Sequence, residues 1–231
     1  MRIAVVEDEM ALNQFLCGLL ENSGHRVKGF FDGESIIKEL KRETYDAILL
    51  DWEMPTRSGL DVLDWMNSNL SSMPPVIMVT SRMAETDVVK ALGAGADDYV
   101  CKPVQPAVML ARLEAVTRRT YNQTAQQACE VFGPYRFDSG GTMVELNGEA
   151  IELTTKELNL ARLMLRNANR PLSRSYLLET VWGHGAELNT RTLDVHISQI
   201  RIKLRLRPEN GLTLSSIYGF GYRLEWLSGE Q

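Results

Sequence analysis

Acidic, hydroxyl and basic side chains recur in the first half of the chain, each at the end of a short apolar run. Glu7 and Asp8 follow IAVV, Asp51 follows AILL, Thr80 closes VIMVT, and Lys102 follows DYVC. Three carboxylates held close together repel one another unless a cation lies among them, and hard oxygen ligands suit Mg²⁺. A lysine and a hydroxyl beside that cation can bind a phosphoryl group, which Asp51 can accept as a nucleophile.

The apolar runs must be strands of one sheet for these side chains to meet. They lie at 3–6, 26–30, 47–50, 76–79 and 98–101, and segments of helical spacing separate them. Several runs are continuous rather than alternating, which indicates strands that are covered on both faces. The order predicts an α/β fold with a doubly wound, five-stranded parallel sheet. Such folds place their site at the carboxyl ends of the strands.

Composition limits the class of protein. The 231 residues are 44% hydrophobic and 24% charged, which is ordinary for a globular protein and enough for two domains. No apolar run approaches about 18 residues and the start lacks a signal-peptide pattern, so we expect a cytoplasmic protein without a membrane partner. Three separated cysteines, Cys17, Cys101 and Cys129, fit a reduced compartment, and we expect Cys101 to be a buried strand thiol.

The net charge of −5 conceals a basic segment, 162–207, in which nine basic side chains stand against three acidic ones. Local charge, rather than the charge of the whole chain, decides whether a surface can bind nucleic acid. Within this segment, 189–207 has helical spacing and places Leu193, Ile197 and Ile200 on one apolar stripe. The basic side chains off that stripe predict an exposed face suited to nucleic acid.

A polar segment without apolar periodicity, 121–129, predicts a linker between a domain at 1–120 and a smaller α+β domain at 130–228. The second domain begins with short alternating strands, continues with three helices, and ends in two strands about a glycine-bearing turn. Its first helix opens with Thr154 and Glu157 at the spacing of a capping box.

The first half resembles the receiver domains of bacterial two-component response regulators. The motifs that carry the resemblance are VVEDE (5–9), LLDWEMPTRSGL (49–60), VTS (79–81) and GAGADDYVCKP (93–103). The resemblance implies a CheY-like receiver with strand order 2-1-3-4-5. It also implies that Thr80 and Tyr99 form a switch pair, in which the hydroxyl turns toward a phosphoryl group and the ring moves inward.

The same resemblance implies roles in phosphoryl transfer. Asp51 is expected to be the phosphoacceptor and Lys102 to pair with the phosphate, followed by a cis peptide bond to Pro103. A sensor histidine kinase or a small acyl phosphate is the implied donor. The expected protein ligands of Mg²⁺ are Glu7, Asp8, Asp51 and the backbone carbonyl of Glu53.

The second half is similar to the winged-helix effector domain of the OmpR/PhoB class of transcription factors. The segments that carry the similarity are LTTKELNLARLML, PLSRSYLLETVWG, NTRTLDVHISQIRIKL and SIYGFGYRL. The similarity implies that two copies bind direct-repeat half-sites on double-stranded DNA and contact RNA polymerase. Arg191 and Arg201 are expected on phosphates, and His196 and Ser198 at base edges. The other expected DNA contacts are Thr154, Thr155, Trp182, Lys203, Tyr218 and Tyr222.

This chain departs from the usual pattern of the class at three places. Ser198-Gln199 stands where many members have two basic residues. In the closing two-stranded hairpin, which is called the wing in this class, Tyr218 precedes the turn glycine where an arginine is common. Receivers of the class pair through a charged interface on phosphorylation, but Val88 and Val108 replace a Lys–Glu pair here. The remaining expected interface residues of the homodimer are Asp97, Asp98 and Arg112.

Two alternatives remain at this stage. One is a magnesium-dependent phosphohydrolase, which also uses an aspartyl phosphate and needs an acid two residues after the nucleophile. Glu53 stands at that position, but the Lys102-Pro103 spacing and the basic second half do not fit such an enzyme. A receiver that forms a constitutive, phosphorylation-independent dimer fits the apolar Val88 and Val108 but not the complete acidic pocket.

Overall fold

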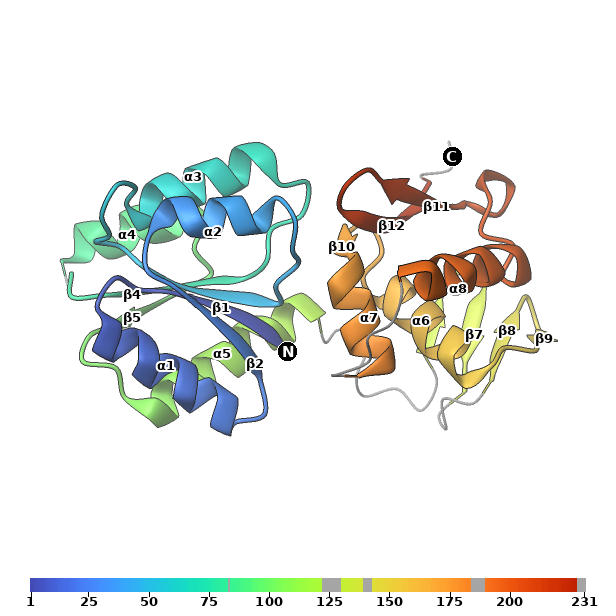
Figure 1. The fold of residues 1–231 in the computed structure, drawn as a ribbon, viewed down its shortest axis with the longest axis horizontal. Helices are drawn as coiled ribbons and strands as arrows, with labels where there is room; N and C mark the ends of the chain where they lie inside the picture. The colour runs from blue at the N-terminus through green and yellow to red at the C-terminus, as the bar shows by residue number, and fades with distance from the viewer. Residues whose placement is uncertain (83, 122–129, 139–142, 184–189, 228–231) are drawn as a thin grey trace. The chain divides into compact units, whose positions relative to one another are not determined.

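The computed structural model describes residues 1–82, 84–121, 130–138, 143–183 and 190–227. The chain divides into two compact units, Met1–Gln123 and Thr124–Gln231 (Figure 1). Most of the expected linker, 122–129 with Cys129, lies outside the described residues, as does Asn189 at the expected start of the third helix. None of the described helices is long and apolar enough to cross a membrane.

The first unit is a five-stranded parallel sheet in the order β2-β1-β3-β4-β5, the order that the resemblance implies. Its strands are β1 (Arg2–Val6), β2 (Arg26–Phe30), β3 (Ala47–Asp51), β4 (Val76–Thr80) and β5 (Asp98–Cys101). Its helices are α1 (Met10–Asn22), α2 (Gly33–Leu40), α3 (Gly59–Asn69), α4 (Glu85–Gly93) and α5 (Pro106–Tyr121). Figure 1 shows α1 and α5 on one face of the sheet and α2 and α3 on the other.

Alternation along the central strands supplies both apolar layers. Ala4 and Leu50 pack with Ile36 of α2 and Val62 of α3, whereas Val5 faces the opposite layer with α1 and α5. All residues of β3 and β4 are buried, as continuous apolar runs predict. Because all five strands run parallel, their carboxyl ends meet at one edge of the sheet.

The second unit begins with a four-stranded antiparallel sheet and ends with a three-stranded sheet in the order β10-β12-β11. The first sheet contains β6 (Glu130–Phe132), β7 (Tyr135–Phe137), β8 (Val144–Leu146) and β9 (Glu149–Ile151). The helices are α6 (Thr155–Arg166), α7 (Arg174–Trp182), α8 (Thr190–Lys203) and the short 3-10 helix η1 (Pro208–Asn210). The second sheet contains β10 (Leu172–Ser173), β11 (Leu212–Ile217) and β12 (Gly221–Trp226).

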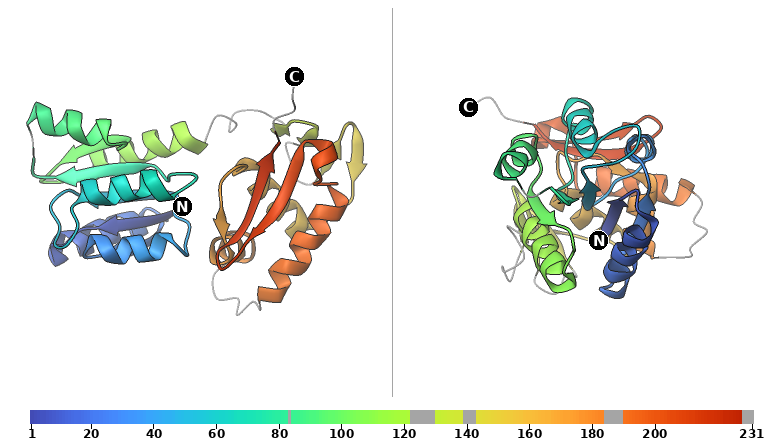
Figure 2. Two further views of the ribbon diagram at one scale, coloured as in Figure 1. Left: turned by 90° about the horizontal axis from the view of Figure 1, so that it is seen from above. Right: turned by 90° about the vertical axis from the view of Figure 1, so that its left-hand side faces the viewer.

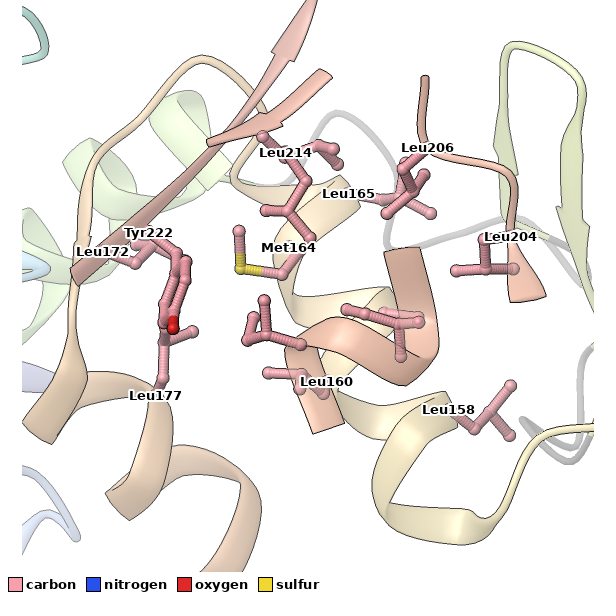
Figure 3. Packing of buried hydrophobic residues seen from close by; sticks show 14 of the residues in the cluster. Leu158, Leu160, Met164, Leu165, Leu172, Leu177, Leu204, Leu206, Leu214 and Tyr222 are labelled. Carbon is pink, nitrogen blue, oxygen red and sulfur yellow. The ribbon is translucent and has the colours of Figure 1, made fainter. Parts of the chain in front are cut away.

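The core of the second unit joins its helices to the carboxyl-terminal hairpin. Leu160 and Met164 of α6 lie among Leu177 of α7 and Leu214 of β11 (Figure 3). The capping box expected at α6 is formed, since the Thr154 hydroxyl accepts from the Glu157 N–H and the Glu157 carboxylate accepts from the Thr154 N–H. The two views in Figure 2 show β11 and β12 running side by side as the hairpin of a winged helix.

Candidate phosphorylation site and nucleic-acid interface

Three carboxylates converge at the carboxyl edge of the parallel sheet. Oxygen atoms of Glu7, Asp8 and Asp51 lie within 4.8 Å of one another. Glu7 and Asp8 follow β1, and Asp51 ends the neighbouring strand β3, so strand pairing brings them together. Lys102, which follows β5, donates from Nζ to Asp51 Oδ2 and to Glu7 Oε1, both at 2.9 Å. Its peptide bond to Pro103 is cis.

Burial dominates the electrostatics of this edge. It raises the pKa of Glu7 to about 7, against the hydrogen bond from Lys102, and the charge of Asp51 raises it further. Burial lowers the pKa of Lys102, but its hydrogen bonds to Glu7 and Asp51 outweigh that effect and raise the pKa above its usual range. Glu7 and Asp51 therefore share Lys102, and the Asp8 carboxylate lies beside them.

The donor set fits a small divalent cation. All three side chains offer carboxylate oxygens, which are the ligands that Mg²⁺ prefers. Glu7 Oε2 is buried and makes no hydrogen bond, although Lys102 Nζ lies 2.8 Å away. A buried carboxylate oxygen without a hydrogen bond is costly unless a cation or water satisfies it. Glu53, whose carbonyl was expected as a further ligand, donates its N–H to Asp51 Oδ1 at 3.4 Å.

The expected switch residues meet on the backbone of Arg82. Thr80 is buried at the end of β4, and its hydroxyl accepts from the Arg82 N–H at 3.2 Å. The Tyr99 hydroxyl donates to the Arg82 carbonyl oxygen, and the Tyr99 ring is buried. Burial raises the pKa of Tyr99, so the phenol remains a donor. Both side chains therefore hold one segment after β4.

The Arg82 side chain, which sequence reasoning missed, connects that segment to the residues that follow β3. Its Nε donates to Glu53 at 3.0 Å, and its guanidinium lies 3.7 Å from an oxygen of Asp87 in α4. The same guanidinium lies 5.2 Å from the ring centroid of Trp52, directly after Asp51. The sequence holds one signal for this contact: Arg82 lies two residues after Thr80, and Glu53 lies two residues after Asp51.

The expected dimer residues lie on α4, β5 and α5 in varied environments. Val88 is half-buried against the α2–α3 layer, whereas Val108 is 40% exposed. Within one chain, Arg112 donates to Asp98 at 2.8 Å, and Asp97 accepts from the Val76 N–H at 2.8 Å.

Two features of this region differ from what the sequence suggested. Helix α4 also exposes Val89 and Leu92, which sequence reasoning missed. The expectation of a buried Cys101 was wrong: β5 is an edge strand, and its last side chain reaches solvent.

Helix α8 buries the apolar stripe that its sequence predicts, since Leu193, Ile197 and Ile200 are at most 1% exposed. Arg191 and Ser198 lie on its exposed side. The Tyr218 side chain is fully exposed at the tip of the β11–β12 hairpin. These positions are accessible to a ligand that lies along α8 and the wing.

Arg201 and Lys203, which were also expected to contact DNA, have their cationic groups engaged inside the domain. Arg201 donates to the Leu214 carbonyl oxygen at 2.8 Å. Lys203 donates to both carboxylate oxygens of Glu157, at 2.8 and 3.0 Å. Burial raises the pKa of Glu157, but hydrogen bonds from Lys203 and Thr154 outweigh it and lower the pKa below its usual range. These contacts attach α8 to β11 and to the start of α6, where Thr154 caps the helix and Thr155 begins it.

Two further clusters fix α8. Trp182 at the end of α7 meets His196 edge to face, with 5.0 Å between ring centroids. The buried Tyr222 donates its hydroxyl to Asp194 at 2.6 Å, and Arg174 pairs with the same carboxylate. No spacing along the chain predicts the Arg174–Asp194 pair, because the two residues belong to different helices.

Family models match both halves of the chain. Residues 3–114 match the family "Response regulator receiver domain", and residues 148–224 match "Transcriptional regulatory protein, C terminal". The sensory transduction protein RegX3 of Mycobacterium tuberculosis is 38% identical over 96% of this chain and 98% of its own. The phosphate regulon transcriptional regulatory protein PhoB of Escherichia coli is 33% identical over 96% of both chains. Among solved structures, the response regulator DrrB of Thermotoga maritima is 29% identical over 97% of this chain and 98% of its own, with a TM-score of 0.47.

Proposed function

The chain belongs to the OmpR/PhoB class of two-component response regulators, and on that basis we propose that Asp51 is its phosphoacceptor and that Mg²⁺ assists the transfer. The family is one of transcriptional regulators that join a receiver to a DNA-binding domain. A sensor kinase and DNA are therefore the partners of this chain. The observation that carries the proposal is the lysine shared between Asp51 and Glu7 beside a third carboxylate.

The chemistry follows from the side chains at the sheet edge. One Asp51 carboxylate oxygen attacks the donor phosphorus, a new O–P bond forms, and the bond from phosphorus to the donor's leaving group breaks. Lys102 is proposed to pair with the phosphoryl oxygens, and its hydrogen bond to Asp51 supports this role. Glu7, Asp8, Asp51 and the Glu53 carbonyl are the proposed ligands of Mg²⁺. The bound ion supplies charge neutralisation for the transferred group.

The proposed response begins at Thr80. When its hydroxyl turns to a phosphoryl oxygen, it gives up the hydrogen bond from the Arg82 N–H, and the segment after β4 is released. The Tyr99 hydroxyl, which also holds Arg82, then loses its partner and the ring can change position. The movement reaches α4 because Arg82 contacts Asp87.

The proposed output is a homodimer that binds two direct-repeat half-sites and contacts RNA polymerase in the cytoplasm. The dimer is proposed to use α4, β5 and α5, with Val88, Asp98, Val108 and Arg112 on these elements and Asp97 directly before β5. In the second unit, α8 and the wing are proposed to meet DNA, with Arg191, Ser198 and Tyr218 accessible to it. The engaged Arg201, Lys203 and Tyr222 are proposed to act mainly by holding α8 in place.

The test is phosphorylation of the full chain with labelled acetyl phosphate and Mg²⁺. The parent should retain label and form dimers, and Asp51→Asn should do neither. Asp64→Asn changes an exposed aspartate on α3 and should behave as the parent. Normal labelling of Asp51→Asn would refute the assignment. Rapid multiple-turnover release of phosphate would favour a phosphohydrolase, and dimers that are unaffected by acetyl phosphate would favour the constitutive alternative.

A further inference from the structure

The exposed face of α8 is largely uncharged. Its exposed residues within 191–203 are Arg191, Asp194, Val195, Ser198, Gln199 and Ile202. Val195 and Ile202 are 57% and 59% exposed, although both are aliphatic. Arg191, the pair Asp194 and Val195, the pair Ser198 and Gln199, and Ile202 recur every three or four residues, so they form one stripe on the side of the helix away from the buried residues. Apolar side chains on such a stripe can pack against apolar groups of a ligand that lies along the helix.

The charged groups beside this stripe are already committed. Arg201 and Lys203 lie at its edges and bind Leu214 and Glu157. Asp194 accepts from Tyr222 and pairs with Arg174. Gln199 is exposed, and its amide makes no hydrogen bond within the described part of the chain. Among residues 191–203, Gln199 is the exposed side chain that carries both an N–H donor and a carbonyl acceptor in one plane.

We propose that Gln199 reads an adenine in the major groove and thereby sets a base preference of this protein. The proposal rests on the proposed function, since it needs α8 to lie in that groove. The Gln199 amide N–H donates to adenine N7, and its carbonyl oxygen accepts from the adenine N6 amino group. Val195 lies one turn earlier on the same stripe, so its methyl groups can pack against the methyl of a thymine in a neighbouring base pair.

The chemistry of the bases explains why adenine is preferred over guanine. Guanine presents two acceptors, N7 and O6, so the Gln199 carbonyl oxygen would face O6 without a hydrogen between them. An arginine at this position would have the opposite preference, because it offers two donors and no acceptor. A matched bidentate pair discriminates by about 5- to 150-fold in affinity, from roughly 1–3 kcal/mol.

The experiment uses the full chain, phosphorylated with acetyl phosphate, and a random double-stranded DNA library. The parent, Gln199→Arg and Gln199→Glu are each used to select bound sequences. One half-site position should change from adenine to guanine with Gln199→Arg, and from adenine to cytosine with Gln199→Glu. Ser198→Ala, the adjacent exposed position, should keep adenine at that position.

A second measurement keeps the test independent of how well a charged variant folds. In the selected site, 7-deazaadenine removes the acceptor N7 at the assigned position. The parent should lose about 3- to 10-fold in affinity, since one of two hydrogen bonds is removed. Gln199→Ala should bind the normal and the modified site equally.

The outcomes separate this inference from the proposed function. A parent that selects no sequence at all would refute the DNA-binding role assigned to α8 and the wing. A parent that selects a clear site, with Gln199→Arg selecting the same base at every position, would overturn the inference and leave the proposed function standing. Equal loss from 7-deazaadenine in the parent and in Gln199→Ala would also overturn it.

Discussion

Gly59 is the position where one added methyl group should disturb β3 and the proposed phosphoacceptor Asp51 most directly. It is the first residue of α3, and its N–H donates to the Trp52 carbonyl oxygen at 2.9 Å. A Cβ atom built on Gly59 would lie 2.2 Å from the Asp51 carbonyl oxygen and 3.1 Å from Met78 Cε. Because the nearest atom belongs to the backbone of a buried strand, rotation of a side chain cannot relieve the contact.

The size of the effect follows from this overlap. The 2.2 Å contact is about 0.8 Å shorter than the 3.0 Å below which Cβ contacts essentially never occur. Displacing buried backbone by that much costs about 1–3 kcal/mol or more, which should lower the Tm of the receiver by roughly 5–15 °C. Asp51 would also move relative to Lys102, and a shift near 1 Å reduces the rate of a positioned reaction on the order of 10- to 100-fold.

The assay compares Gly59→Ala with Gly18→Ala by thermal unfolding and by the rate of labelling with acetyl phosphate. Gly18 lies within α1, and a Cβ there meets nothing within 4 Å. Gly18→Ala should therefore stabilise the receiver by about 0.5–1 kcal/mol and leave the labelling rate unchanged. Parent-like stability and labelling of Gly59→Ala would show that β3 yields at little cost, which would refute the close-packing argument.

Three further predictions concern the switch, the second domain and the dimer. Arg82→Ala removes an exposed ion pair with Glu53 and a stacking contact with Trp52, which together are worth about 1 kcal/mol. The dimerisation constant of the unphosphorylated protein, measured by sedimentation, should therefore rise about fivefold. An unchanged dimerisation constant would exclude Arg82 from the switch. Glu157→Gln should cost about 1–3 kcal/mol at pH 7, measured by urea unfolding. Folding lowers the pKa of Glu157, so the stability that the ionised carboxylate contributes is complete above the unfolded pKa near 4.5 and is lost as the pH falls through the folded pKa. A cost of Glu157→Gln that does not change with pH would contradict the Glu157–Lys203 ion pair as its cause. Val88→Lys should weaken the beryllofluoride-induced dimer, and adding Val108→Glu should restore it in part, whereas dimers unaffected by Val88→Lys would place this face outside the interface.

Much of the receiver could be predicted because its signals are local. A buried parallel strand must be apolar along its whole length, so β3 and β4 stand out in the sequence. Once the strands are known, the carboxyl-edge rule brings Asp51 and Lys102 together although they are 51 residues apart. The capping box at Thr154 is equally local, since both of its partners lie within one helical turn.

Contacts between elements could not be obtained in this way. No periodicity relates Arg82 to Trp52, because their meeting depends on how the segment after β4 folds over the end of β3. Cys101 follows three residues of an edge strand, and sequence alone does not reveal which strand ends at the solvent.

The basic residues of α8 show that a count of charges does not reveal which cations are engaged within the domain. A helical wheel places the buried stripe correctly, but Arg201 and Lys203 lie at its edges, where a long side chain can turn either way. Here both turn inward, because the Leu214 carbonyl oxygen and the Glu157 carboxylate accept hydrogen bonds from them. Each cation held in this way is one fewer for DNA phosphates, so sequence-independent affinity falls while α8 becomes better fixed. A fixed helix with an uncharged exposed face shifts recognition from phosphates toward base edges, which is where Gln199 and Val195 are positioned to act.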